Sequence, residues 1–153
     1  MDTKLKKFLE KNDAKFDIVA HRKVYTAYDE AETQRMKPKE VAKTVLLKAD
    51  KEMVLAVIPA AKNVDFGKVK KKLGAKKVSM AKAKDITGRL KSKIGLIHPF
   101  GPVYNIQTLV DNAVLKEKKI RTSAGSYTES IEISPARYKK LVEPITGSFS
   151  KSK

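Results

Sequence analysis

A lysine interrupts the apolar run Val41-Ala42-Lys43-Thr44-Val45-Leu46-Leu47, and no other residue of this chain has a type and setting so suggestive of chemistry. An ammonium group leaves water at a high cost unless it is paired or has a function. Two interpretations are open. Either Lys43 lies on the outer face of a half-buried strand and extends its charge to solvent, or it belongs to an active site.

Two loops could form the walls of such a site. The segment Gly95–Gly101 contains two glycines and Pro99, which predicts a rigid turn where the backbone can approach a ligand closely. Residues 123–126 are all small and lie between two expected strands, so their backbone could face a substrate. Ordinary connecting turns are the alternative for both loops, and a lone histidine such as His98 is more often a turn residue than a general base.

Signatures of other chemistries are missing. The sequence has no phosphate-binding or dinucleotide-binding glycine motif, no His-x-x-x-His spacing and no serine in a nucleophile elbow. It has no cysteine, and its two histidines, His21 and His98, are too few for a typical zinc site. We therefore expect neither a metal nor a cofactor.

The charge balance favours a polyanionic partner. Lys and Arg number 34 against 17 Asp and Glu, a formal net charge of +17. Such an excess speeds encounter with nucleic acid, although a highly charged surface can also serve solubility alone. Four lysines share the polar face of one expected helix, opposite Phe66, Val69 and Leu73, and they are candidates for holding a nucleic-acid backbone: Lys68, Lys70, Lys71 and Lys72.

Helical and β-type patterns are interspersed along the chain. The sequence predicts helices over 3–10, 26–36, 65–74, 80–90 and 134–142, and a brief helical segment at Pro38. It predicts strands over 16–21, 44–48, 53–58, around Val78, and over 105–110, 120–123 and 130–133, with 44–48 and 53–58 forming a hairpin. The fold class expected is α+β, in one domain over residues 1–146 followed by a flexible basic tail, 147–153.

A location in the cytoplasm is the default expectation. No apolar run approaches the roughly 18 residues that span a bilayer. The N-terminus lacks the apolar region and cleavage site of a signal peptide.

Several short motifs follow one another in a familiar order. They are a strand ending near His21, then Val24-Tyr25-Thr26, Val41-Ala42-Lys43-Thr44-Val45, Gly95-x-x-x-Pro99-Phe100-Gly101, Thr108-Leu109-Val110-Asp111, Ser123-Ala124-Gly125-Ser126 and Ile131-Glu132-Ile133-Ser134-Pro135. Over residues 16–142 this series resembles the YbaK/ProX family of aminoacyl-tRNA deacylases, relatives of the editing domain of bacterial prolyl-tRNA synthetase.

The resemblance implies a curved mixed β-sheet or barrel flanked by short helices. It also implies a freestanding enzyme that hydrolyses the ester between a wrong amino acid and the 3′ end of tRNA. Water would be placed by backbone groups and the terminal ribose hydroxyl. The implied partners are mischarged tRNA and an aminoacyl-tRNA synthetase, with no membrane. The rival interpretation is a non-catalytic module of the same fold that binds tRNA or a synthetase.

The resemblance also assigns residues. Those matched to catalysis are Lys43, Gly95, Pro99 and Gly101. Those expected to contact substrate are Tyr25, Thr26, His98, Phe100, Ser123, Gly125 and Ser126. Relatives that clear alanine carry a histidine in the late strand and loop, whereas this chain has Arg121-Thr122-Ser123-Ala124-Gly125 there. This departure argues against alanine as the amino acid removed.

Overall fold

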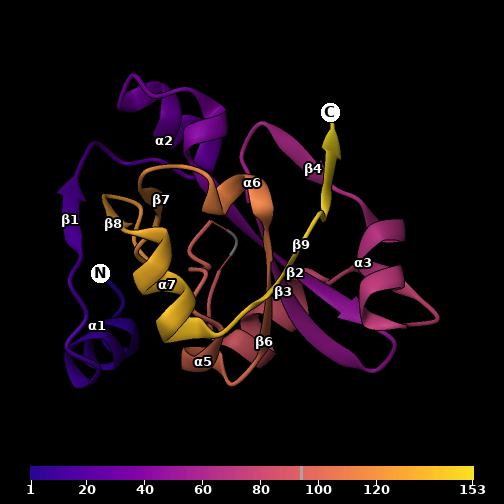
Figure 1. Cartoon of the computed structure of the whole chain (residues 1–153). Helices are drawn as coiled ribbons and strands as arrows, with labels where there is room; N and C mark the ends of the chain where they lie inside the picture. The colour runs from indigo at the N-terminus through magenta and orange to yellow at the C-terminus, as the bar shows by residue number, and fades with distance from the viewer. Residues whose placement is uncertain (94) are drawn as a thin grey trace.

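A computed structural model describes residues 1–93 and 95–153 and has short helices packed around mixed sheets (Figure 1). The helices are α1 (Thr3–Lys11), α2 (Ala27–Thr33), the 3-10 turn η1 (Pro38–Glu40), α3 (Phe66–Leu73), α4 (Ala83–Asp85), the π-helical turn η2 (Ile86–Leu90), α5 (Gly101–Tyr104), α6 (Asn112–Leu115) and α7 (Pro135–Val142). The strands are β1 (Asp17–Ala20), β2 (Ala42–Ala49), β3 (Glu52–Pro59), β4 (Lys62–Val64), β5 (Val78–Met80), β6 (Gln107–Asp111), β7 (Ile120–Ser123), β8 (Glu129–Ile133), β9 (Ile145–Gly147) and β10 (Ser150–Ser152).

Within the described residues, the strands form three sheets of order β5-β2-β3-β6-β9, β1-β8-β7 and β4-β10. Strand β6 runs parallel to β3 and β9, and the other pairs are antiparallel. The predicted α+β class with mixed sheets and short helices is therefore confirmed, with separate sheets in place of one closed barrel. A bridge between Val41 and Arg121 joins the start of β2 to β7 and so connects the two larger sheets.

The predicted hairpin is formed by β2 and β3, in a register that pairs Ala49 with Glu52. Asp50 makes the turn with a φ of 54°, a left-handed conformation that aspartate tolerates. All residues of β3 from Val54 to Pro59 are buried, as expected for an apolar strand covered on both faces. Lys43 lies opposite Ile58 of this buried strand, so the lysine is held by a rigid part of the fold.

Helix starts that the sequence predicts are capped as expected. The Thr26 hydroxyl accepts a hydrogen bond from the Asp29 amide (3.0 Å), and Asp65 and Ser134 accept equivalent bonds at the starts of α3 and α7. Gly74 ends α3 with a φ of 65°, a conformation that glycine adopts without strain. These caps satisfy amide groups that would otherwise lack partners.

Several segments differ from the prediction. Helix α2 ends at Thr33 and not near residue 36, because Arg35 turns the chain with a φ of 55°. In the segment 80–90, Met80 belongs to β5, where it pairs with Leu47, and helical structure starts only at Ala83. The sequence analysis did not predict the short elements β4, α5, α6 and β9.

The C-terminal segment is part of the fold, although we expected residues 147–153 to be a flexible tail. Strand β10 pairs with β4, and Phe149 is only 1% exposed. The carboxylate of Asp111, at the end of β6, accepts hydrogen bonds from the Phe149 amide, the Ser150 hydroxyl and the Ala113 amide, each at 2.8 Å. Burial of the Phe149 ring and the hydrogen bonds to the Asp111 carboxylate hold this segment in place, although its polar composition predicts a flexible tail.

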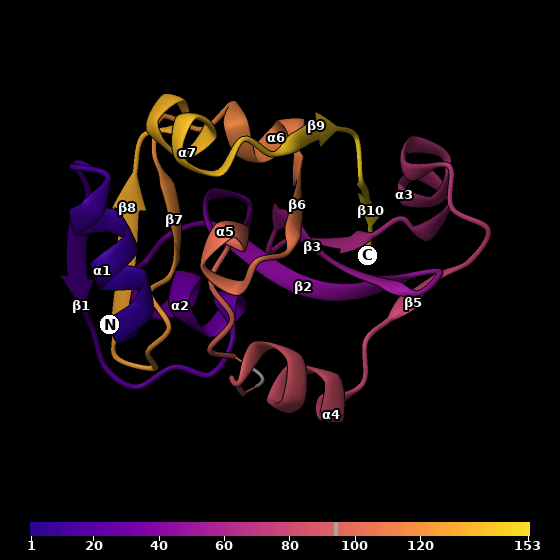
Figure 2. The same ribbon diagram turned by 90° about the horizontal axis from the view of Figure 1, so that it is seen from below.

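The described residues form four apolar clusters in the core. One gathers around Phe100 and Tyr138, between the three-stranded sheet and helices α1 and α7, and another lies around Val69 of α3 and Phe149. Figure 2 shows α3 at the opposite end of the molecule from α1 and the three-stranded sheet. In the part of the chain that the structure describes, no helix combines the length and apolar composition needed to cross a bilayer.

Replacing Asp111 with Ala is expected to lower the free energy of unfolding by about 2–4 kcal/mol, because a buried charged acceptor of several hydrogen bonds is removed. Amide exchange at Phe149 should accelerate, with exposed Asp17→Ala as the control. Burial raises the pKa of Asp111, but its hydrogen bonds outweigh this effect and lower it overall. The stability they supply is therefore present above about pH 4 and declines as the carboxylate is protonated at lower pH. Unchanged exchange at Phe149 would refute this tether.

Candidate active site

A small pocket of about 80 Å³ opens where α2, the start of β2 and the three-stranded sheet meet. Its walls come from five stretches of chain: the end of β1, helix α2, strand β2, the loop after Lys93, and the connection from β7 to β8. The lining residues are His21, Val24, Tyr25, Thr26, Ala27, Glu30, Ala42, Lys43, Thr44, Gly95, Ile97, Thr122, Ser123, Ser126 and Ser130. A pocket this small suits a small chemical group and not a bulky side chain.

Lys43 lies in this pocket, half-buried at the start of β2. It makes no hydrogen bond or ion pair with any of the described residues. Burial lowers the pKa of Lys43, and the charge of Lys153 lowers it further. Lys153 is held nearby, with its Nζ 5.5 Å from the centre of the Tyr28 ring. An amine without a partner in a concave polar site is available to a ligand.

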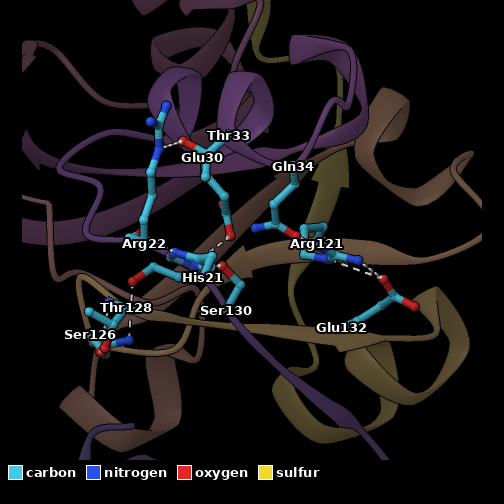
Figure 3. A network of polar contacts seen from close by, with 12 residues as sticks. His21, Arg22, Glu30, Thr33, Gln34, Arg121, Ser126, Thr128, Ser130 and Glu132 are labelled. Carbon is cyan, nitrogen blue, oxygen red and sulfur yellow. Dashed lines mark hydrogen bonds and ion pairs between the residues drawn. The ribbon is translucent and has the colours of Figure 1, made fainter.

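Three polar side chains come together on another side of the pocket, as Figure 3 shows: His21, Glu30 and Ser130. The Nδ1 of His21 lies 2.7 Å from the Arg22 carbonyl and therefore donates to it, while Nε2 lies 2.8 Å from the Ser130 hydroxyl. Glu30 is 3% exposed, and its Oε1 is 4.0 Å from His21 Nε2. Burial raises the pKa of Glu30 to about 7, against the opposing charge of Arg121. This carboxyl therefore changes charge near neutral pH.

Backbone forms the opposite wall. Gly95 has a φ of 88°, and a Cβ at this position would lie 2.4 Å from the Tyr25 carbonyl oxygen. Only glycine therefore allows the two chain segments to meet here. The Ser123 hydroxyl accepts from the Gly125 amide and that of Ser126 from the Thr128 amide, each at 3.1 Å. These bonds fix the loop whose small side chains face the pocket.

Residues 98–101 of the Gly95–Gly101 turn lie behind the pocket, whereas Ile97 lines it together with Gly95. His98 and Phe100 are buried, and the Pro99 carbonyl accepts a hydrogen bond from the Tyr138 hydroxyl at 2.6 Å. A Cβ on Gly101 would lie 2.0 Å from the Thr108 hydroxyl, so this glycine permits packing. The structure thus does not bring His98, Pro99, Phe100 or Gly101 to the pocket. A bulky residue at Gly101 would disturb the core and would not reach a ligand.

His98 is packed between other groups. Its ring stacks on Tyr104 at 4.4 Å, its Nδ1 accepts from the Phe100 amide at 3.3 Å, and its Nε2 lies 3.6 Å from the Asp2 carboxylate. Burial lowers the pKa of His98. Gly125 also faces Asp2 and not the pocket. These contacts anchor the N-terminus to the loops behind the site.

A second, larger cleft lies beside the pocket. It measures about 830 Å³ and shares the pocket's two loops, since Lys93 and Leu96 flank Gly95 in sequence, and Gly125 and Tyr127 flank Ser126. The rings of Tyr127 and Tyr25 are 4.9 Å apart at the boundary between the two. Basic side chains line this cleft, among them Lys4, Arg89, Lys91 and Lys93. A basic surface therefore adjoins the pocket.

The four lysines predicted to hold nucleic acid lie elsewhere, on α3. Lys68 donates to the Ser148 hydroxyl (3.1 Å) and the Ser150 carbonyl (3.2 Å), so it holds the C-terminal segment in place. Lys70, Lys71 and Lys72 are exposed. In both views α3 lies far from α2, which borders the pocket (Figures 1 and 2).

Comparison with known proteins decides what kind of domain this is. Residues 21–141 match the family described as "Aminoacyl-tRNA editing domain". The chain belongs to this family. All residues that line the small pocket, from His21 to Ser130, lie within the matched stretch.

Solved structures share the fold of this editing domain. One, the crystal structure of hypothetical protein APE2540, has a TM-score of 0.89 and 20% identity, with 97% of this chain and 99% of that chain covered. Another is described as a candidate trans-editing enzyme for prolyl tRNA synthetase, with a TM-score of 0.83, 15% identity and 99% of both chains covered. A candidate signal transduction protein from Marinobacter aquaeolei VT8 has a TM-score of 0.71 and 15% identity, with 98% of this chain covering 31% of that one. The fold therefore occurs both alone and within a longer chain.

Sequence reasoning missed part of the pocket of this editing domain. Glu30 lies in an acidic stretch that resembles a solvated helix face, yet it falls three residues after Ala27 and next to buried Ala31. That helical spacing was the available signal. His21 and Ser130 are 109 residues apart, and only the pairing of β1 with β8 brings them together. Among the described residues, no group of three or more potential metal ligands converges.

Replacing Glu30 with Gln should change how the stability of the editing domain depends on pH. A buried carboxyl whose pKa rises from 4.5 to about 7 binds more protons folded than unfolded, so the free energy of unfolding falls as pH rises across this interval. The variant lacks this fall and should gain about 1–3 kcal/mol relative to the parent between pH 4.5 and 8. Its thermal midpoint should rise by about 2–4 °C per kcal/mol. The control is exposed Glu32→Gln on the same helix, and parallel pH curves for parent and Glu30→Gln would contradict the prediction.

Proposed function

We propose that this protein is an aminoacyl-tRNA deacylase that hydrolyses the ester of mischarged tRNA in trans. The observation that carries the proposal is the small polar pocket with Lys43 unpaired inside it, in a chain of the editing-domain family. A candidate trans-editing enzyme with the same fold over 99% of both chains supports action in trans.

The reaction needs little from the protein. Water attacks the ester carbonyl carbon, the tetrahedral intermediate carries negative charge on the former carbonyl oxygen, and the bond to the ribose oxygen then breaks. The products are the free amino acid and a tRNA whose 3′ hydroxyl has taken a proton. Since the ester is already activated, positioning the water and stabilising the oxyanion can suffice. The Gly95 wall allows a close backbone approach, and Lys43 supplies positive charge for the oxyanion or the terminal phosphate.

The basic cleft beside the pocket suits the tRNA backbone. Lys4, Lys91 and Lys93 are exposed and would bind the phosphates. Arg89 is less available, because it donates hydrogen bonds to the carbonyls of Tyr104 and Asn105. Tyr25, which is 54% exposed at the pocket rim, offers a face on which the terminal adenine can stack. Phosphate contacts of this kind position a nucleic acid without reading its sequence.

Replacing Lys43 with Ala should reduce single-turnover deacylation by roughly 100-fold or more, the usual loss when one oxyanion-stabilising group is removed. The thermal midpoint should stay unchanged or rise, because burial disfavours the charged amine. Lys48→Ala, an exposed position on the same strand, is the matched control. Full activity of a folded Lys43→Ala protein would exclude a catalytic role. Binding of tRNA without turnover by the parent protein would instead support a non-catalytic docking module.

Two triple variants locate the tRNA. Changing Lys4, Lys91 and Lys93 to Ala should weaken binding to all tRNAs and flatten the log–log salt dependence by about 0.7–0.9 for each phosphate that the protein no longer neutralises. Turnover at saturating tRNA should change little. The comparison variant changes Lys70, Lys71 and Lys72 on α3, which carry the same charge at a distance from the pocket. A flatter slope only for the α3 variant would place the tRNA on α3, as the sequence alone predicts.

A further inference from the structure

Two polar atoms in the pocket have no partner among the described residues. The Oε1 of Glu30 and the hydroxyl of Thr44 are both fully buried and make no hydrogen bond with any of these residues. Both side chains line the same pocket of about 80 Å³. Leaving a buried polar group without a hydrogen-bond partner destabilises the folded protein. Two such groups in one small pocket indicate that a ligand, or water in its absence, completes their hydrogen bonds.

No described neighbour of Glu30 donates a hydrogen bond to its Oε1, and the Nε2 of Gln34, one turn later at the end of α2, is likewise buried without a partner. His21 donates through Nδ1 to the Arg22 carbonyl, so in the neutral ring Nε2 is the acceptor of the Ser130 hydroxyl proton. At 4.0 Å, Nε2 is beyond hydrogen-bond distance of Glu30 Oε1.

Arg121 is the cation near Glu30, and it is also occupied. It bonds Glu132 through Nε at 3.0 Å and through NH2, and it bonds the Gln34 side-chain oxygen through NH1 (Figure 3). Its positive charge acts on Glu30 at a distance but gives it no hydrogen bond. Glu30 thus faces the pocket as a free acceptor.

We propose that Glu30 and Thr44 bind the side-chain hydroxyl of the aminoacyl group, so that this pocket selects a small hydroxylated amino acid over its apolar counterpart. A hydroxyl donates one hydrogen bond and accepts others, so it can donate to Glu30 and accept from Thr44 at once. The volume of the pocket limits the side chain to a small one such as that of serine. This inference rests on the proposed deacylase function and adds the substrate class.

The expected selectivity follows from what an apolar ligand leaves behind. An alanyl ester would fill the same space but leave Glu30 and Thr44 without partners. A site that hydrogen-bonds a substrate hydroxyl rejects the analogue lacking it far more strongly than an apolar pocket rejects a missing methylene. We expect kcat/KM for seryl-tRNA to exceed that for alanyl-tRNA, both on the same tRNA, by about 10⁴-fold, the lower end of the discrimination that such hydrogen-bonding sites reach.

The decisive variant is Glu30→Met, which keeps an unbranched side chain of similar length but removes the acceptor. At about pH 8, where Glu30 is mainly ionised, the ratio of seryl to alanyl kcat/KM should fall by at least about 10-fold, one hydrogen bond to a charged group being worth about 1.5–3 kcal/mol. Alanyl hydrolysis should persist, which shows that the variant is folded and catalytically competent. Glu32→Gln, exposed on the same helix, should keep the parent's ratio.

Two results would overturn the assignment. Unchanged kcat/KM on both esters in Glu30→Met would remove Glu30 from substrate recognition altogether. An equal loss on both esters would assign Glu30 to the α-ammonium group, which serine and alanine share.

A binding experiment separates this inference from the deacylase function. Calorimetry with non-hydrolysable adenosine analogues, carrying serine or alanine through a 3′ amide, measures selection without turnover. A seryl preference that disappears in Glu30→Met would support the inference even if no tRNA ester were hydrolysed, in which case the deacylase function alone would fail. Equal affinity of the parent protein for the two analogues would overturn it, whatever the hydrolysis results.

Discussion

The pocket lies where the chain, at the start of β2, is bonded to both of the larger sheets. Along its length β2 pairs with β3 and β5, while the bridge from Val41 to Arg121 ties its start to β7. The first residues of β2 therefore cross the junction of the two larger sheets, where neither sheet alone covers them. Lys43 and Thr44 lie at this junction, and helix α2 closes it from another side. The regular apolar part of the strand supplies the stability, and its irregular start supplies the concave surface.

The C-terminal segment is coupled to this junction through a chain of specific contacts. Asp111 holds Phe149 and Ser150, β10 then pairs with β4, and Lys153 comes close enough to Lys43 to lower the pKa of its amine. The electrostatic state of the pocket lysine thus depends on a carboxylate at the end of a different strand. Loosening the C-terminal segment would remove a like charge from Lys43 without touching the pocket walls.

The sequence predicted the features that depend on residues close together in the chain and missed those that depend on residues far apart in it. The caps at Thr26, Asp65 and Ser134 and the hairpin from residue 44 to 58 depend on neighbours in sequence, and these predictions were correct. The C-terminal strand depends on Asp111, 38 residues before Phe149, and composition alone made that segment resemble a frayed end. The order of motifs identified the family, but it could not show which residues of the Gly95–Gly101 turn face the pocket. That distinction depends on the positive φ of Gly95 and on the packing of Phe100 against Tyr138.

The surface lysines and the buried carboxyl of Glu30 have different electrostatic effects. The net charge of +17 favours any polyanion and carries no information about the amino acid attached to it. Selection among amino acids therefore requires a site where the electrostatic field of the lysines is weaker than local effects such as burial. Glu30 is such a site, because burial raises the pKa of this carboxyl to about 7 although Arg121 opposes the change. A carboxyl so poorly solvated gains more from one well-placed hydrogen-bond donor than it would at the surface. Under the proposed function, the basic cleft holds the nucleic acid, while the adjoining pocket, which combines Lys43 with several hydroxyls and the buried acid Glu30, discriminates among small side chains.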